Sequence, residues 1–358
     1  MTEDSLMKLT RTDILFKEKI ESLEWLRPRY YDVIIDYFAN LQPQNVQVSR
    51  EKRYKSVLDV ISKLWVTSEK NPSIFKEAKD FEPILQRIPK YRDHFILSFN
   101  VFLLGYYITN TLKRINPDLD LKSNDYNLTW MLASTFHDVA YALQEIEFWF
   151  NELLERFLGV NPKFSFNIVE VMPLIYVDFM RMISRWHKYP VQGPISSETL
   201  AITDWMFYNE VSSKLVEKDH GVLGGLMLAH LLAVREGFAK ERKWDFLYNH
   251  LPACHAITVH HLTSIPIKFS KHPIAFMLML CDELQDWGRP SNQANQDIIY
   301  LNEMNITEMD CPEIQFVIEI SKTRKKILRK TLSNLHTCGK VKVTIRDTEK
   351  RIISSIKH

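Results

Sequence analysis

The chain has 358 residues, of which 46% are hydrophobic and 25% charged, a composition that suits a globular protein with a sizeable core. Its formal net charge of +2 excludes a strong overall field that would attract nucleic acid or membranes. The four cysteines form no CxxC pair, which argues against a thiolate zinc site, and reduced thiols fit a cytoplasmic protein. The N-terminal residues lack the apolar core of a signal peptide, and we count no apolar run of the roughly 18 residues that span a bilayer.

Glycine is scarce, with only nine residues, and four of them lie between Gly221 and Gly237. Rossmann and P-loop nucleotide sites need glycine in their tight turns, and neither GxGxxG nor GxxxxGK occurs. The predicted fold class is therefore mainly α.

Residues 1–90 are predicted to form an N-terminal helical region. Apolar residues recur at helical spacing over Ile14–Leu26, Tyr30–Leu41 and Val57–Val66, and Gln42–Val48 is predicted to be a loop. No chemical motif occurs here, so a packing or partner-binding role is the simpler interpretation.

Two strongly apolar helices are predicted next. The first covers residues 91–113, with His94 near its start. The second covers Leu128–Leu158 and carries the adjacent pair His137 and Asp138. Gly159 and the residues after it are expected to end this helix.

Residues 160–219 form a long insertion, which we interpret either as ordinary packing helices or as a cap over a site. Residues 220–235 then begin with His220 and carry three glycines. Each glycine in a helix costs about 1 kcal/mol relative to alanine. Their presence predicts that another backbone comes close to this helix.

The following segments carry more polar groups in apolar surroundings. Residues 252–263 include the doublet His260 and His261, and residues 273–289 predict a final apolar helix that contains Asp282.

The last part of the chain predicts a small α+β region. Ile298–Ile306 and Ile314–Ile320 are strand-like, and Ser321–Leu335 is predicted to be a basic helix. Val341–Ile345 alternates apolar and polar residues with the period of a half-buried strand, and a turn over Arg346–Lys350 leads into further apolar residues.

Seven polar groups at apolar or glycine-rich helix positions could ligate a metal: His94, His137, Asp138, His220, His260, His261 and Asp282. A single histidine on an apolar face is more often a hydrogen-bonded core residue than a ligand. Asp138 and Asp282 are harder to explain in that way, because a buried carboxylate needs a cation or several donors. Histidine and carboxylate ligands without thiolate suit manganese, iron, magnesium, cobalt or zinc.

The order H…HD…H…H…D resembles the HD-domain superfamily of metal-dependent phosphohydrolases. Its neighbouring segments are RDHFILSFNVFLLG, STFHDVAY, DHGVLGGLMLAHLL, HAITVHH and LCDELQDWGRP, the last typical of one branch. The resemblance covers roughly residues 91–290 and implies an HD-type helical bundle. The predicted domains are accordingly 1–90, then 91–295 with the helical insertion 160–219, and finally 296–358.

The resemblance also implies a ligand set for one or two divalent ions, chosen from Mn, Fe, Mg, Ni, Co and Zn. The first ion would be held by His94, His137, Asp138 and Asp282. A second would be held by His220 and His260, with Asp138 bridging the two. The doublet leaves the register open, so His261 is the alternative to His260.

This ligand set implies a function as an expectation: hydrolysis of a phosphoester of a nucleotide or nucleotide-like substrate by metal-activated water. Asp138 would orient that water, and Tyr141 and Arg289 would bind phosphate, although packing for Tyr141 and a salt bridge for Arg289 are the simpler alternatives. No GYP motif follows His261, which argues against cyclic di-GMP as the substrate.

Two other functions stay open. The HD fold could act as a nucleotide- or metal-responsive sensor or scaffold with little turnover. The basic run Lys322–Lys330 could contact nucleic acid, although such a run is more often a solvated helix face. The sequence predicts no membrane partner and leaves the oligomeric state undefined.

Overall fold

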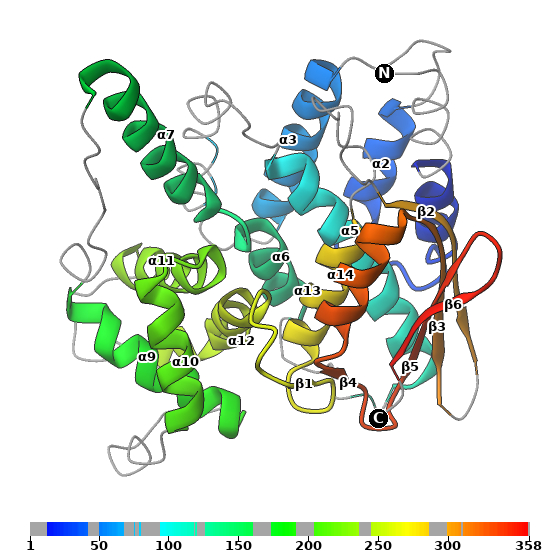
Figure 1. Ribbon diagram of the computed structural model, residues 1–358. Helices are drawn as coiled ribbons and strands as arrows, with labels where there is room; N and C mark the ends of the chain where they lie inside the picture. Colours follow the sequence, from blue (N-terminus) through cyan, green and yellow to red (C-terminus); the bar gives the residue numbers. More distant parts are fainter. Residues whose placement is uncertain are drawn as a thin grey trace. The chain divides into compact units, whose positions relative to one another are not determined.

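The structure is a computed structural model that describes residues 13–41, 50–67, 75, 79, 94–117, 119, 126–159, 173–190, 204–235, 245–285, 299–308 and 311–356. It is mostly helical, with a small strand-containing part near the C-terminus (Figure 1). The predicted mainly α class with a C-terminal α+β region is confirmed at this level. The domain boundaries after residues 90 and 295 stay predictions.

The chain divides into two compact units. The first contains Met1–Pro72, Phe95–Ser134 and Thr263–His358, and the second contains Ser73–His94 and Thr135–Leu262. Each unit is therefore assembled from segments that are distant in the sequence.

The helices of the first unit match the apolar periodicity of the sequence. Residues 13–21 are helical, and the longer helices are α2 (Tyr31–Leu41), α3 (Arg50–Thr67), α5 (His94–Ile115), α6 (Tyr126–Phe136) and α13 (Pro273–Leu284). The predicted helices before residue 67 and the helix after residue 91 are confirmed, while the predicted loop Gln42–Val48 lies outside the described residues. The sequence predicted that the last apolar helix would extend to residue 289, but helix α13 ends at Leu284. Residues 286–298 lie outside the described part.

Helix α5 is the apolar centre of the first unit. Among the described residues it is the one helix long and apolar enough to cross a membrane, and its most apolar 18-residue window is 100% buried inside the protein. The sequence has no uninterrupted apolar run of this length, because serine, asparagine and threonine interrupt the apolar residues, but the helix stays apolar on average. The core helix of a soluble protein has the same length and composition, and the burial of α5 favours that role.

Gly105 of α5 makes room for a buried tryptophan. A Cβ at Gly105 would lie 2.0 Å from Cζ2 and 2.5 Å from Cε2 of Trp130. The Trp130 ring cannot swing away easily, because its indole N–H donates to the Phe102 carbonyl at 3.0 Å and the side chain is fully buried. The glycine therefore fixes how closely α6 approaches α5.

Gly105→Ala is expected to lower the free energy of unfolding by about 1–3 kcal/mol, because overpacking forces the ring or the backbone to shift. Denaturant unfolding of the variant measures this. Trp130→Phe removes part of the ring that would clash with the new Cβ. It should therefore lower the free energy of unfolding less in the Gly105→Ala protein than in the wild-type protein. Strictly additive losses would contradict the contact.

The C-terminal part of the first unit is a four-stranded sheet covered by a helix (Figure 1). Its elements are β2 (Tyr300–Thr307), β3 (Glu313–Glu319), α14 (Lys322–Leu332), β5 (Lys342–Asp347) and β6 (Ile352–Ile356). The strand order is β2-β3-β5-β6, with β3 and β5 parallel and the two outer pairs antiparallel. Helix α14 connects the two parallel strands, as such a crossover requires. The predicted strands and basic helix are confirmed.

A second, smaller sheet joins two distant segments. Strand β1 (Ile267–Lys268) pairs in parallel with β4 (Leu335–His336). Strand β1 directly precedes α13, so this pairing fixes the start of the helix that carries Asp282.

Several basic side chains of α14 are used within the first unit. Arg324 lies 3.2 Å from Glu283, and Lys325 lies 2.9 Å from Asp347. Arg329 Nε donates to the Ile353 carbonyl at 2.7 Å. These contacts give part of the basic run a structural role, and nucleic-acid binding through Lys322–Lys330 stays a prediction.

Asp347 closes the turn between β5 and β6. Its carboxylate accepts hydrogen bonds from Lys325 Nζ, Arg351 N and Arg351 Nε, each at 2.9 Å. The hydrogen bond from Lys325 and then those from Arg351 outweigh burial and hold the pKa of Asp347 far below its ordinary value of 3.8. A carboxylate with a lowered pKa contributes stability above its ordinary pKa, and this contribution is lost as the pH falls toward the folded-state pKa.

Asp347→Asn is therefore expected to lower the melting temperature at pH 7, with a difference from wild type that narrows below about pH 4. Thermal unfolding of both proteins at several pH values measures the difference. Glu349 also pairs with Arg351, at 2.7 Å, but is exposed, so Glu349→Gln should change little. A difference for Asp347→Asn that stays constant down to pH 3 would contradict the assignment.

The second unit is helical over its described residues. Its helices are α7 (Tyr141–Leu158), α9 (Pro173–Lys188), α10 (Trp205–Val216), α11 (His220–Arg235) and α12 (Asp245–Val259). Helices α9 and α10 lie within the insertion 160–219. The predicted helix at residues 220–235 is confirmed, and α12 ends just before the histidine doublet.

Helices α11 and α12 approach through the three glycines of α11, as the sequence predicts. A Cβ at Gly225 would lie 2.1 Å from Thr258 Oγ1 and 2.8 Å from the Cys254 carbonyl. A Cβ at Gly221 would lie 2.9 Å from the Ile257 carbonyl. The backbones can pack this closely only because glycine has no side chain.

The predicted single helix over Leu128–Leu158 was wrong, because the chain turns at residues 137–140 between α6 and α7. Val139 N donates to Phe136 O at 3.3 Å, and Tyr141 N donates to Asp138 O at 2.9 Å. These bonds span three residues in place of the four of an α-helix, so the helix is interrupted. Gly159 ends α7 in the left-handed conformation, with φ of 61°, as expected.

Candidate metal centre

The turn between α6 and α7 presents the His137–Asp138 pair. His137 is fully buried, whereas the side chain of Asp138 keeps 20% of its exposure. His137 Nε2 lies 3.6 Å from Asp138 Oδ2. Because the pair occupies a turn, both side chains can face the same side of the second unit, which neighbouring positions of an α-helix do not allow.

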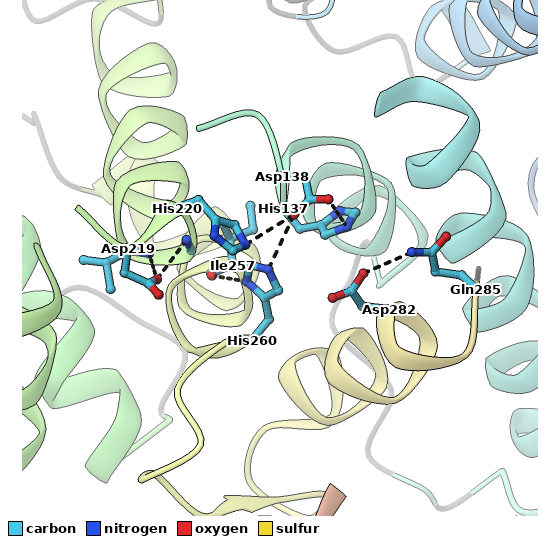
Figure 2. A network of polar contacts seen from close by, with 10 residues as sticks. His137, Asp138, Asp219, His220, Ile257, His260, Asp282 and Gln285 are labelled. Atoms are coloured by element: carbon cyan, nitrogen blue, oxygen red, sulfur yellow. Dashed lines mark hydrogen bonds and ion pairs between the residues drawn. The ribbon is translucent and has the colours of Figure 1, made fainter. Parts of the chain in front are cut away.

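Two further histidines face the other oxygen of the same carboxylate (Figure 2). His220, the first residue of α11, places its Nε2 3.4 Å from Asp138 Oδ1. His260, the residue after α12, places its Nε2 3.9 Å from the same oxygen. Three separate segments of the second unit therefore converge on Asp138.

A backbone carbonyl defines the tautomer of His260. His260 Nδ1 lies 2.6 Å from the Ile257 carbonyl, which can only accept, so Nδ1 carries the proton. In the neutral ring, Nε2 then carries the lone pair on the side of Asp138. Such a hydrogen bond at the far nitrogen is the usual support of a metal-ligating histidine.

Charge and burial set the protonation of the group. Burial raises the pKa of Asp138, but His137, His260, His220 and His94 together lower it more, so the pKa lies well below its ordinary value. Burial lowers the pKa of His220 to about 4, against the opposing attraction of Asp138. At neutral pH Asp138 is therefore an ionised carboxylate and the imidazole of His220 that faces it is neutral, the states that metal ligation requires of these two groups.

His94 belongs to the same group. It is the first residue of α5 and, unlike the rest of that helix, belongs to the second unit. It is buried, and its charge lowers the pKa of the Asp138 carboxyl group. Five of the six predicted metal-ligating residues thus belong to the second unit: His137, His220 and His260 lie 3.4 to 3.9 Å from the Asp138 carboxylate, and the charge of His94 acts on the pKa of Asp138.

His261, the alternative ligand of the doublet, lies beside His220. The ring centroids of the two residues are 4.3 Å apart, and one nitrogen from each of His220, His260 and His261 lies within 4.8 Å of the others. His260 is buried and faces Asp138, whereas His261 is exposed. The geometry favours His260 for the Asp138 group and leaves His261 available on the outer side of His220.

Of the remaining predicted residues, the structure describes Tyr141 and Asp282 but not Arg289. Tyr141, the first residue of α7, sets its ring perpendicular to that of His220 with centroids 5.8 Å apart. Asp282 lies on α13 in the first unit, where Gln285 donates to it at 3.4 Å (Figure 2). Its role beside the five residues of the second unit stays a prediction. Arg289 lies outside the described residues.

A second histidine pair in the second unit is explained by hydrogen bonding. His187 Nδ1 lies 3.1 Å from His255 Nε2, and the ring centroids are 5.4 Å apart. The centroid separation exceeds the nitrogen separation by about two ring radii, so the nitrogens face each other head-on. That is the geometry of an N–H···N bond, whereas two ligands of one ion would converge at an angle.

Sequence reasoning missed the groups that support the ligands. The Ile257 carbonyl carries no sequence signal, because every residue has one. Gly221 was recognised as a close-approach glycine, but not as the neighbour of a ligand: its Cβ would lie 3.0 Å from His260 Nδ1.

The donor set fits a divalent cation. Ligand atoms that are each about 2.0–2.2 Å from one ion lie roughly 3–3.5 Å from each other. The three distances from imidazole nitrogens to the Asp138 carboxylate, 3.4 to 3.9 Å, are close to this spacing. The arrangement could hold an ion between one carboxylate and several imidazoles, a set that suits a borderline or hard divalent metal.

No family model, curated protein or solved structure matches this chain.

Proposed function

We propose that this chain is an HD-type, metal-dependent phosphohydrolase that cleaves a phosphoester of a nucleotide or nucleotide-like substrate. One observation carries the proposal: imidazole nitrogens from three segments of the second unit surround the Asp138 carboxylate at 3.4 to 3.9 Å. The order of these residues in the chain, which resembles the HD superfamily, adds the reaction class.

One or two divalent ions would be held by this group. His94, His137 and Asp138 would hold the first, together with Asp282 as the resemblance implies. His220 and His260 would hold a second, with Asp138 shared, and Mn, Fe, Mg, Ni, Co and Zn are all compatible with the donors. When bound, such an ion supplies Lewis acidity, which activates water and offsets charge on a phosphoryl group.

The side chains have distinct tasks in this proposal. The Asp138 carboxylate is ionised at neutral pH, so it can accept a hydrogen bond from the attacking water and orient that water toward phosphorus. His260 keeps its Nε2 lone pair on the ligand side, because Nδ1–H donates to Ile257. Tyr141 would offer its hydroxyl to a phosphate oxygen, and Arg289 is the predicted second phosphate contact.

The test is a metal-resolved activity screen. The purified chain is stripped with a chelator, then supplied with Mn²⁺, Mg²⁺, Ni²⁺ or Fe²⁺ and incubated with a panel of nucleotides and simple phosphoesters. We expect release of phosphate or nucleotide product with at least one metal and none in the chelated protein. Tight nucleotide binding without turnover for every metal would contradict the proposal and would favour the sensor or scaffold.

A further inference from the structure

The residue two positions before His220 has an unusual backbone. Lys218 has a φ of 58°, in the left-handed region that residues with a side chain rarely adopt. Such a conformation costs free energy and persists only where the surroundings enforce it. It forms the turn between α10 and α11, because Lys218 N donates to Leu215 O at 3.0 Å and Asp219 N donates to Lys214 O at 2.9 Å.

An ion pair with α7 accompanies this turn. Lys218 Nζ lies 2.5 Å from Oε1 and 2.6 Å from Oε2 of Glu147. The two side chains keep only 22% and 18% of their exposure. A partly buried pair in which one ammonium contacts both carboxylate oxygens is better defined than the exposed pairs that contribute little.

The next residue fixes the start of α11. Asp219 Oδ1 accepts hydrogen bonds from Gly221 N at 3.0 Å and from Val222 N at 3.1 Å, as an N-cap residue does (Figure 2). His220 is the first residue of α11 and directly follows this cap, so its direction depends on how Lys218 and Asp219 are placed.

The ion pair therefore connects two parts of the candidate metal centre. Helix α7 begins directly after the turn that carries His137 and Asp138, and Glu147 lies on that helix. The turn at Lys218 leads into His220, whose Nε2 lies 3.4 Å from Asp138. A shift of α11 relative to α7 would change this distance directly.

We propose that the Lys218–Glu147 ion pair is a positioning element of the metal centre, which holds the left-handed turn and thereby aims His220 at Asp138. This inference rests on the proposed function only in that the centre binds a divalent ion. Neither Lys218 nor Glu147 is a ligand in this account. Both act through His220.

The experiment measures metal binding directly. The full chain is titrated with Co²⁺, and its visible absorption reports both the affinity and the coordination of the ion. We expect Glu147→Gln and Lys218→Met to weaken Co²⁺ binding by about tenfold or more and to alter the spectrum, as loss of an outer support does. The double variant Glu147→Lys, Lys218→Glu should recover much of the affinity.

Two further variants separate positioning from folding. Lys218→Gly removes the ion pair but suits the left-handed backbone, so its melting temperature should equal or exceed that of Lys218→Met while its Co²⁺ affinity stays low. Glu217→Gln breaks the exposed pair with Lys214 in the same turn and should leave Co²⁺ binding unchanged. Wild-type affinity and spectrum in Glu147→Gln would overturn this inference alone. Absence of Co²⁺ binding by the wild-type chain would overturn the proposed function as well.

Discussion

Replacing His137 and Asp138 together by alanine is expected to remove bound metal and to reduce phosphoester hydrolysis to background. Asp138 supplies the carboxylate that faces His137, His220 and His260, so its loss removes the shared donor of the group. Without it, the remaining imidazoles lack the negative charge that favours a divalent cation over a water molecule.

Elemental analysis and activity measured on the same preparation test this expectation. Circular dichroism and thermal unfolding establish that the double variant folds. His230→Ala is the matched control, because His230 lies on α11 with His220 but is not part of the candidate centre, so metal content and activity should match wild type. Full metal content in the His137→Ala, Asp138→Ala protein would show that the site is wrongly assigned.

Gly221→Ala is expected to weaken metal binding by about tenfold or more, because it disturbs a ligand through its support. The new Cβ would lie 2.9 Å from the Ile257 carbonyl and 3.0 Å from Cε1 and Nδ1 of His260. It would therefore press on both partners of the hydrogen bond that orients His260. Overpacking of roughly 1–3 kcal/mol is partly offset by the better helix propensity of alanine, about 1 kcal/mol.

Gly224→Ala is the control for this prediction. Its Cβ would meet the Ile257 Cγ2 methyl at 3.1 Å and two backbone carbonyls at 3.4 Å, so only a small side-chain shift is needed. Metal titration should show near-normal affinity for Gly224→Ala and a clear loss for Gly221→Ala. Equal affinities in the two variants would mean that the close contact at Gly221 does not control His260.

Periodicity predicted much of the fold because burial and side-chain pattern agree in most segments. The apolar residues Ile314, Phe316 and Ile318 of β3 and Val343 and Ile345 of β5 are buried, as the pattern predicts. The pattern did not predict that three polar residues of these strands, Glu313, Thr344 and Asp347, are buried as well. The three glycines of α11 predicted that another backbone comes close to this helix. The structure confirms this, because the Cys254 and Ile257 carbonyls of α12 lie against Gly225 and Gly221.

The break at His137–Asp138 could not be predicted in the same way. Apolar residues continue at helical spacing through this region, and neither glycine nor proline marks the turn. The interruption of the helix is visible only in the structure, where backbone N–H groups donate hydrogen bonds to Phe136 O and Asp138 O across three residues. This local departure from the pattern lies at the centre of the candidate site, where such departures are often functional.

The order of the histidines along the chain predicted which residues are candidate ligands, but it did not predict which groups hold each ligand in place. The tautomer of His260 depends on a carbonyl, and the direction of His220 depends on the left-handed backbone of Lys218 and its pairing with Glu147. These are three-dimensional relations between residues far apart in the chain, and spacing along the sequence does not encode them.

Anomalous X-ray diffraction from crystals grown with Mn²⁺, Fe²⁺, Co²⁺ or Zn²⁺ tests the central claim most directly. We expect one or two peaks per chain within ligand distance of Asp138, with His137 and His94 at the first and His220 and His260 at the second. A single peak would decide in favour of one ion, and two would make Asp138 the bridge. Crystals that show no peak beside Asp138, or peaks only elsewhere on the chain, would contradict the account.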